Sequence, residues 1–380
     1  MHRYTEVIAG LTMSGRLEAA WRGAFERAPR HAFVPDTVWL PDEYSLSGYR
    51  QVERSREPDA WWDAVSADEA VVTQLDDGMS GGPGTSTSSG SMPSLVATML
   101  RELAVQDGHR VLDVGTGTGW TSALLAARLG GEQVTTIEID PALAAEAGRK
   151  LDAAHLAPCR VVGDGLGGWS PGSPYDRIHS TAAVRTIPQA WIEQTVPGGI
   201  VVTPWGTPYA NAGLLRLVVE GPGQEAHGRF VENASFMWMR AQRPHMVAAP
   251  ASGTTRTGAS PMDPELAEED VHSAFAIGLR VPGVRSIHCW DRTDPTATYR
   301  IELSDGHGSW ASVRYRNWED GGAVKQTGPR QLWDEVCEAR TWWVERGRPE
   351  LTRFGLTVRP DGRQHTWLDS PAHPVGDIAH

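Results

Sequence analysis

Apolar residues along this chain recur with different spacings, and each spacing predicts a different element. Residues 11–30 carry apolar side chains every three to four positions, which predicts a helix. The stretch 78–91 is rich in glycine and serine and is expected to form a loop. Apolar positions return at 93–103, where a second helix opens with a proline in its first turn. The first ninety residues therefore predict an irregular cap that ends in a polar loop.

Between 110 and 205 the pattern alternates between short apolar runs and longer amphipathic ones. The short runs predict strands at 111–114, 134–137, 160–162, 177–179 and 200–203. The longer runs predict helices at 120–129, 141–154 and 189–194. Strands that alternate with helices in this way indicate a parallel, doubly wound α/β sheet of the Rossmann type.

Beyond residue 205 the pattern is that of antiparallel hairpins with one long helix. Hairpins are predicted at 214–231, 297–315 and 354–368, and an amphipathic helix at 331–346. A Pro-, Ser- and Thr-rich stretch, 244–262, is expected to be a linker. The predicted domains are 1–90 as an N-terminal cap and substrate loop, 91–243 as the α/β domain, 244–262 as the linker, and 263–380 as a smaller α+β domain for substrate recognition.

Composition narrows the possible partners. The chain has 35 Lys and Arg against 47 Asp and Glu, a net charge of -12, so nucleic acid and anionic membrane are not expected partners. It has no apolar run of the roughly 18 residues that a membrane helix needs. Its three cysteines, Cys159, Cys289 and Cys337, are too far apart for a zinc motif, which fits a cytoplasmic protein. No histidine stands at a metal-ligand spacing, so no metal is expected.

The strongest chemical signal is a glycine-rich turn between the first predicted strand of the α/β domain and its helix. Residues 111–120 read VLDVGTGTGW, and Glu138 at the end of the next strand lies 19 residues past Gly119. A carboxylate at that spacing can accept hydrogen bonds from both hydroxyls of a ribose. Gly163, Asp164 and Gly165 follow the third strand. These features together predict a nucleoside site.

The spacing of the glycines suggests which nucleoside it is. Dinucleotide sites use G-x-G-x-x-G and place a pyrophosphate at the helix N-terminus. Here the spacing is G-x-G-x-G, and Asp113 precedes the first glycine. A carboxylate at that point would repel a pyrophosphate but suits a sulfonium, as in S-adenosylmethionine. The pattern therefore favours a ligand with a sulfonium or ammonium group over a dinucleotide and disfavours an oxidoreductase, and the resemblance given next implies a class I S-adenosylmethionine-dependent methyltransferase.

The sequence resembles the protein-L-isoaspartate O-methyltransferases over residues 28–240. The matching segments are PRHAFVP at 29–35, SMP at 91–93, the glycine turn, EID at 138–140, GDG at 163–165, YDRI at 175–178, AA at 182–183, IP at 187–188 and PGG at 197–199. The resemblance places the family's active-site serine at Ser91, with Ser89 in place of its threonine. For the cofactor site it implies Ser88, Asp113, Gly115, Thr116, Gly117, Thr118, Gly119, Glu138, Ile139, Asp164 and Gly165.

Serine hydroxyls suit this chemistry. A carboxylate is already ionised near pH 7 and needs no general base to attack a sulfonium methyl. It needs alignment, and hydroxyl donors can orient one of its oxygens without neutralising it. The alternative for any one of these serines is the N-cap of the helix that begins at Pro93.

Two departures from the repair enzymes suggest a more specialised substrate. The loop before Ser91 is longer than theirs, and about 140 residues follow the α/β domain. The layout is similar to methyltransferases that accompany ATP-grasp ligases in graspetide and imiditide pathways, and lanthipeptide-associated relatives share it. That similarity implies methylation of an aspartate in a ribosomal precursor peptide, followed by closure to aspartimide or hydrolysis to isoaspartate. Isoaspartate repair, lanthipeptide tailoring and a degenerate peptide-binding module remain alternatives.

Overall fold

The computed structural model describes residues 2–45, 47–221, 223, 225–244, 254–290 and 299–378. Contacts divide the chain into two compact units. Unit 1 comprises 1–182, 188–202 and 218–224, and unit 2 comprises 183–187, 203–217 and 225–380. Each unit is described by itself.

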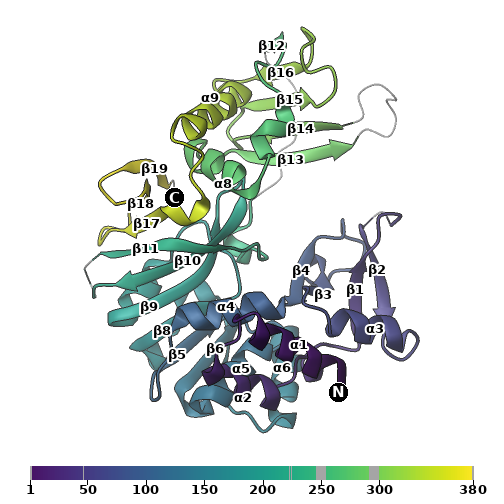
Figure 1. Cartoon of the computed structure of the whole chain (residues 1–380), viewed down its shortest axis with the longest axis vertical. Helices are drawn as coiled ribbons and strands as arrows, with labels where there is room; N and C mark the ends of the chain where they lie inside the picture. The colour runs from purple at the N-terminus through teal and green to yellow at the C-terminus, as the bar shows by residue number, and fades with distance from the viewer. Residues whose placement is uncertain are drawn as a thin grey trace. The chain divides into compact units, whose positions relative to one another are not determined.

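The predicted doubly wound α/β sheet is confirmed. Its parallel strands lie in the order β9-β8-β5-β6-β7, with the glycine turn after the central strand β5. The elements are β5 (Val111–Val114), α5 (Trp120–Leu129), β6 (Val134–Glu138), α6 (Pro141–Ala153), β7 (Cys159–Val162), β8 (Tyr175–Ser180), α7 (Gln189–Glu193) and β9 (Thr195–Gly206). Helix α4 (Pro93–Leu103) packs against β8, α5 against β5 and α6 against β6 (Figure 1).

The N-terminal helix differs from its prediction. In place of one helix over 11–30 there are two, α1 (His2–Met13) and α2 (Ala19–Arg27). Between them Gly15 has a φ of +70°, a left-handed conformation that ends a helix and that glycine adopts without a steric cost. Trp21, Ala24 and Phe25 of α2 are buried, and α2 packs on α5.

The glycine- and serine-rich stretch is also a correction, because its second half is a strand. Residues 86–90 form β4 (Ser86–Gly90), which pairs antiparallel with β3 (Val71–Leu75) and places Ser89 opposite Val72. The four-stranded sheet has the order β2-β1-β3-β4, with β1 (Thr37–Pro41), β2 (Tyr49–Glu53) and the helix α3 (Pro58–Val65). Val38, Val52, Trp61, Val65 and Val71 form its core. Ser86, Ser88 and Ser89 are therefore fixed in a sheet, and Ser91 directly follows its last residue.

Unit 2 contains a five-stranded antiparallel sheet with two helices. Its order is β12-β16-β15-β14-β13. The elements are β12 (Thr255–Gly258), α8 (Val271–Arg280), β13 (Arg285–Trp290), β14 (Tyr299–Ser304), β15 (Trp310–Arg314), β16 (Val324–Thr327) and α9 (Leu332–Glu345). The predicted helix at 331–346 buries Leu332, Trp333, Val336, Ala339 and Trp343, the face its spacing predicts. Strand β12 lies within the stretch expected to be a linker, of which 245–253 lie outside the described residues.

The last strands of the chain join the sheet that contains the α/β core. The hairpin β10 (Asn211–Val219) and β11 (Ala226–Asn233) follows β9, and β11 pairs with β17 (Phe354–Val358). Then come β18 (Gln364–Leu368) and β19 (Pro374–Ile378), which complete a ten-stranded sheet. The boundary between the α/β and α+β parts predicted at 244–262 stays a prediction.

Candidate active site

The glycine turn after β5 has no space for side chains. Gly115 and Gly119 have φ values of +87° and +88°. A Cβ at Gly115 would lie 3.1 Å from the Thr181 Oγ1, and a Cβ at Gly119 would lie 3.1 Å from the Cβ of Ala147 on α6. The turn therefore needs glycine both for its backbone conformation and for close packing of α6 against the start of α5.

The Glu138 carboxylate is fixed beside this turn. It lies at the end of β6, is 7% exposed, and accepts hydrogen bonds from the Gly117 N–H (2.8 Å) and the Asp140 N–H (3.0 Å). Two backbone donors on its two oxygens hold the carboxylate in one orientation.

Asp113 occupies a different environment from the one its position suggested. Its carboxylate is fully buried and bonds the His179 Nδ1 (2.8 Å) and the Ser122 hydroxyl (2.6 Å). These partners come from α5, which begins directly after the turn, and from β8, which pairs with β5. The carboxylate therefore ties the sheet to α5 beneath the turn and does not present itself to a ligand.

Strand β4 brings serine hydroxyls to the glycine turn. The Ser88 Oγ accepts a hydrogen bond from the Thr73 hydroxyl (3.2 Å) and lies 3.7 Å from the point where a Cβ on Gly117 would stand. Ser89 and Ser91 follow on the same segment and are partly exposed. The Ser91 hydroxyl makes no hydrogen bond to any residue that the structure describes. It is available to a ligand.

The alternative in which a serine caps α4 is wrong. The N-cap residue is Met92, whose side chain makes no capping bond. The carboxylate of Asp68 accepts the Ser94 N–H instead, at 2.8 Å. A side chain from the segment before β3 thus does the capping, which leaves Ser91 free of that role.

A buried arginine holds the end of β4 in place. Arg30 is fully buried, and its guanidinium donates to the carbonyls of Val65 (3.0 Å), Ala67 (3.1 Å), Glu69 (2.6 Å) and Gly90 (2.8 Å). Burial lowers the pKa of Arg30 to about 10, so it remains charged near neutral pH. Since Gly90 directly precedes Ser91, this arginine fixes the backbone at the candidate active-site serine. Sequence analysis placed Arg30 in a family segment but assigned it no role.

Gln74 connects the serine strand to the Glu138 strand end. Its Nε2 donates to the Asp140 Oδ2 (3.1 Å), and its Oε1 accepts from the Thr87 hydroxyl (2.9 Å). Asp140 in turn caps α6 through the Ala142 and Leu143 N–H groups. Hydrogen bonds therefore connect β4, through Gln74 of β3, to Asp140, whose backbone N–H donates to Glu138.

The remaining predicted site residues lie at the ends of β6 and β7. Ile139 and Val162, the second of which was not among the predicted site residues, are 38% and 59% exposed, which is high for apolar residues and leaves them free to cover a flat apolar ligand. Asp164 is exposed and accepts the Leu166 N–H (3.0 Å), while Trp191 donates its Nε1–H to the Gly165 carbonyl (2.8 Å). These contacts shape a rigid rim after β7. An adenosyl group fits this set of groups: a fixed carboxylate, two apolar side chains and a glycine turn.

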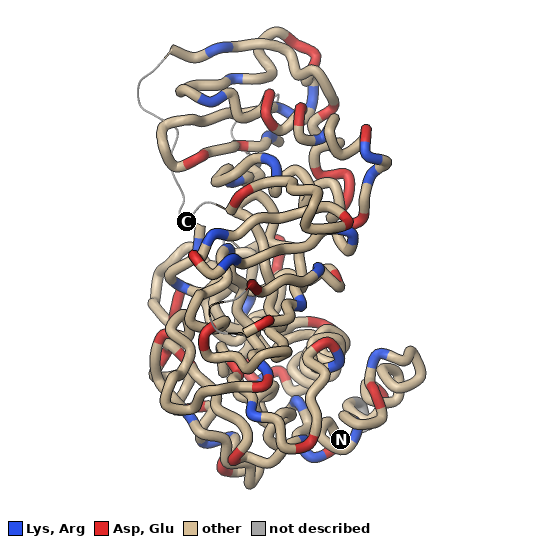
Figure 2. Tube along the Cα trace, turned by 90° about the vertical axis from the view of Figure 1, so that its left-hand side faces the viewer, with Lys and Arg blue, Asp and Glu red and all other residues tan. Residues whose placement is uncertain are grey.

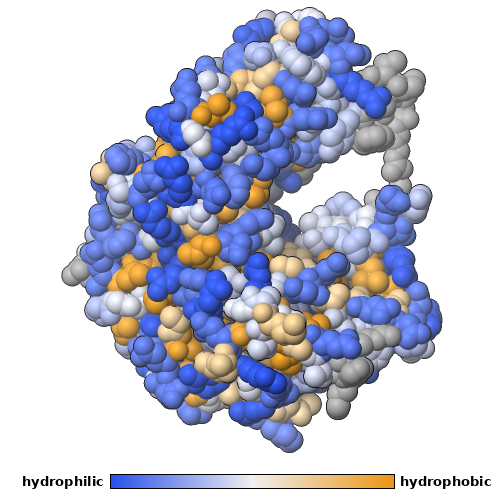
Figure 3. Space-filling model, in the orientation of Figure 1, coloured by the Kyte–Doolittle hydropathy of each residue, from blue (hydrophilic) through white to orange (hydrophobic). Residues whose placement is uncertain are grey.

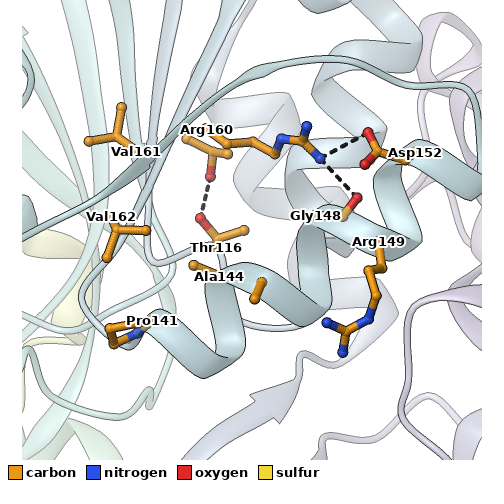
Figure 4. A pocket seen from close by; sticks show the side chains of 11 residues that line it. Thr116, Pro141, Ala144, Gly148, Arg149, Asp152, Arg160, Val161 and Val162 are labelled. Atoms are coloured by element: carbon orange, nitrogen blue, oxygen red, sulfur yellow. Dashed lines mark hydrogen bonds and ion pairs between the residues drawn. The ribbon is translucent and has the colours of Figure 1, made fainter.

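A cavity of about 300 Å³ opens beneath α6, next to this rim (Figure 4). Ala144, Ala145 and Gly148 line it, since small side chains on that face of the helix leave space. Figure 4 shows Arg160 crossing it to the Gly148 carbonyl and Asp152, both at 2.9 Å. Thr116 and Val162 also line this cavity, whereas Glu138 and the serines of β4 do not, so it adjoins the candidate site and shares two of its residues.

In the view of Figure 2, acidic and basic residues are interspersed along the trace of the described residues. The face drawn in Figure 3 is mostly hydrophilic, with apolar side chains scattered over it. Within the described ranges, no helix is long and apolar enough to cross a bilayer, and no group of three or more His, Cys, Asp or Glu could hold a metal ion.

The central part of the chain is similar to known proteins. Residues 70–235 match the family model described as protein-L-isoaspartate(D-aspartate) O-methyltransferase. A protein-L-isoaspartate O-methyltransferase from Methylorubrum populi is 42% identical over 132 residues, which cover 35% of this chain and 61% of that protein. One from Pyrococcus horikoshii is 40% identical over 134 residues, 35% of this chain and 60% of that protein.

A solved structure extends the likeness to the whole chain. It is titled protein-L-isoaspartate O-methyltransferase and aligns with 97% of this chain and 100% of its own, with a TM-score of 0.53 at 18% identity. The chain has the class I methyltransferase fold. The methyltransferase domain spans about three fifths of the length of the curated relatives it matches. The alignment with the solved structure extends over the C-terminal part of the chain as well.

Proposed function

We propose that this protein transfers the methyl group of S-adenosylmethionine to the free carboxylate of an isoaspartyl residue in a protein or peptide. The observation that carries the proposal is the family match over 70–235, which includes both the glycine turn and the serine strand. The names of the relatives support an isoaspartyl substrate better than a dedicated precursor peptide.

The cofactor would lie over the strand ends of unit 1. Glu138, already oriented by two backbone N–H groups, would accept hydrogen bonds from the ribose hydroxyls. Ile139 and Val162 would cover the adenine, with Asp164 and Gly165 at its edge. Asp113 would act as a positioning residue through His179 and Ser122. When bound, S-adenosylmethionine supplies an electrophilic methyl group.

The serine strand would orient the nucleophile. One carboxylate oxygen attacks the methyl carbon, the C–O bond forms as the C–S bond breaks, and the sulfur keeps the electron pair of the broken bond. The carboxylate carries no proton, so no base is required. The hydroxyls of Ser91 and Ser89 would donate to the other oxygen and hold the attacking one in line.

A second candidate is an aspartate in a dedicated precursor peptide. The observation that favours it is the long turn between β3 and β4. There the Asp76 carboxylate accepts the N–H groups of Gly84 and Thr85, which shapes a segment that could contact a particular peptide. After methylation the next backbone nitrogen would attack the ester, lose its proton and release methanol, which gives aspartimide. A lanthipeptide substrate belongs to the same candidate.

Mass spectrometry of three peptides separates these functions. The full-length protein and S-adenosylmethionine are incubated with an isoaspartyl hexapeptide, its aspartyl counterpart and the precursor peptide of any ribosomal-peptide cluster that contains the gene. A gain of 14 Da on the isoaspartyl peptide supports the proposal. The second candidate is supported if the precursor alone first gains 14 Da, as the methyl ester, and then reaches a mass 18 Da below that of the unmodified precursor, as aspartimide. If no peptide is methylated while S-adenosylhomocysteine binds, the fold serves as a binding module.

A further inference from the structure

The five-stranded sheet of unit 2 has one face in the core of that unit and one face outside the core. Helix α9 packs against β14, β15 and β16 (Figure 1). On the side of this helix the fully buried side chains of Ile301, Leu303, Ala311 and Val313 form part of one apolar cluster. Side chains alternate between the two faces of a strand, so the residues between these four lie on the opposite side of the sheet. We call that side the open face.

The register of the strands determines which side chains share the open face. Its charged and aromatic members are Arg285, Arg300, Glu302, Trp310, Arg314 and Lys325. Lys325 is exposed and the other five are partly exposed. The open face therefore presents four cationic side chains and one indole ring, with a single carboxylate among them.

Two of the cationic residues lie in an unfavourable arrangement. Arg300 of β14 and Arg314 of β15 stand directly opposite each other in the sheet. Like charges in this position destabilise a sheet. The carboxylates beside them lie elsewhere: Glu302 is on the same strand as Arg300 (2.8 Å), and Asp320 reaches Arg314 from the turn between β15 and β16 (3.5 Å). The stability of the sheet therefore does not explain why two arginines face each other here.

The two remaining cations of the open face have no carboxylate partner. The Arg285 guanidinium donates to the Pro244 carbonyl (2.9 Å), and neither Arg285 nor Lys325 forms an ion pair with a described residue. The whole chain has a net charge of -12, so a surface with this excess of positive charge is a local feature. Arginine and tryptophan are also enriched among the residues that contribute most to binding at protein interfaces.

We propose that the open face binds an acidic segment of a partner protein. Carboxylates of the segment would pair with Arg300, Arg314 and Lys325, and the ring of Trp310 would cover an apolar part of the segment. Five strands about 4.8 Å apart make the face about 20 Å wide, which an extended segment of about six residues spans. This binding does not depend on methyl transfer, because every residue that takes part belongs to unit 2.

The size of the face favours a peptide over a nucleic acid. A short acidic segment can lie entirely on the open face. A nucleic acid carries a phosphate at every nucleotide and would extend beyond the face, where the excess of Asp and Glu in the rest of the chain would repel it.

Fluorescence anisotropy with the full-length protein tests the proposal. The probes are a labelled octapeptide that contains four glutamates and the same peptide with four glutamines. In about 50 mM salt we expect the glutamate peptide to bind about tenfold more tightly, because several partly exposed ion pairs add together. In about 500 mM salt the ratio should fall towards one, since salt screens such pairs. Equal affinities at low salt, or a ratio that salt does not change, would overturn the proposal.

Matched variants assign the effect to the open face. R300Q/R314Q should reduce the affinity ratio to about one, and K325Q should reduce it in part. R346Q/R359Q also removes two exposed arginines of unit 2, but both lie outside the face, so the ratio should persist. Thermal unfolding checks the fold, and K325Q, which changes one exposed side chain, tests the face even if the double variant unfolds.

Two results would contradict the assignment to an acidic peptide. The first is a ratio that stays at the wild-type value in both R300Q/R314Q and K325Q, or that falls equally in R346Q/R359Q. The second is displacement of the labelled glutamate peptide by a single-stranded oligonucleotide at lower concentrations than the unlabelled glutamate peptide requires, which would make the open face a nucleic-acid site.

Discussion

At the scale of single residues, several polar side chains of the candidate site are fixed by hydrogen bonds within the protein, whereas the Ser91 hydroxyl has no such bond to a described residue. Glu138 is held by two backbone donors, Asp113 by His179 and Ser122, and Ser88 by Thr73. The Ser91 hydroxyl, which we assign to catalysis, has no hydrogen-bond partner among the described residues. A hydroxyl without a partner in the protein can donate to the substrate carboxylate, while the fixed residues around it keep their positions.

Replacement of Ser91 by alanine should lower kcat/KM on the isoaspartyl peptide by about 10- to 100-fold, because a hydrogen bond to a charged group is lost. S-adenosylhomocysteine affinity should stay unchanged. Steady-state kinetics and calorimetry measure the two effects. Ser170→Ala, at an exposed serine of the same unit, serves as the control. Unchanged kcat/KM in Ser91→Ala would remove this hydroxyl from the mechanism.

Replacement of Glu138 by glutamine should weaken S-adenosylhomocysteine binding by about tenfold or more, since one charged acceptor becomes a donor. Isothermal titration calorimetry measures the loss. The exposed Glu132, six residues earlier, provides the matched variant Glu132→Gln, which should bind like the wild type. Equal affinity in both variants would mean that the ribose assignment is wrong.

The environments of Asp113 and Arg30 could not be read from the sequence. Position and glycine spacing placed Asp113 near a ligand, but its partner His179 lies 66 residues away and meets it only because β5 and β8 are neighbours in register. Arg30 likewise meets carbonyls that lie 35 to 60 residues further along. Pairings at such separations depend on the completed fold, which local patterns do not contain.

At the scale of elements, the sequence predicted best where each strand is buried on both faces. Strands 111–114 and 134–137 and helix 120–129 match β5, β6 and α5 closely. Short segments rich in valine, leucine and isoleucine are typical of the buried strands of a parallel sheet. Strand β4 was missed since serine and glycine have low strand propensity, and only its pairing with β3 makes it a strand. The helix expected over 11–30 was interrupted at Gly15.

Arg30 unites several of these elements, so its replacement should act at this scale. Arg30→Met leaves four carbonyls without their charged donor and should lower the free energy of unfolding by about 3 kcal/mol or more. Denaturant unfolding measures the change. Arg22→Met removes an exposed pair with Glu26 and should cost less than about 1 kcal/mol. Similar losses in the two variants would show that the buried contacts contribute little.

At the scale of the whole molecule, unit 2 should contribute a pH-dependent term to stability. The His288 Nε2 lies 2.8 Å from the Glu268 carboxylate, and this hydrogen bond raises the pKa of His288 despite partial burial. Because the folded-state pKa is the higher one, the stabilisation is complete below about pH 6.5, the unfolded value, and is lost as pH rises through the folded value. With His288 37% exposed, the effect should not exceed about 1 kcal/mol.

Urea unfolding between pH 5 and 8 measures this dependence. The wild type should lose more stability across the range than Glu268→Gln, in which the histidine has no charged partner. The comparison uses the slope with pH, since the variant also loses a hydrogen bond from Ser286. Parallel profiles for the two proteins would contradict the assignment.

Because the chain is synthesised from its N-terminus, strand β11 of the ten-stranded sheet is made well before the strand that pairs with it. Strand β11 ends at Asn233, but its partner β17 begins only at Phe354, about 120 residues later. At ribosomal rates this delay is on the order of ten seconds, during which β11 is an open sheet edge on the nascent chain. Such an edge can pair with other chains, so the newly made protein passes through an aggregation-sensitive interval that ends when its last strands emerge.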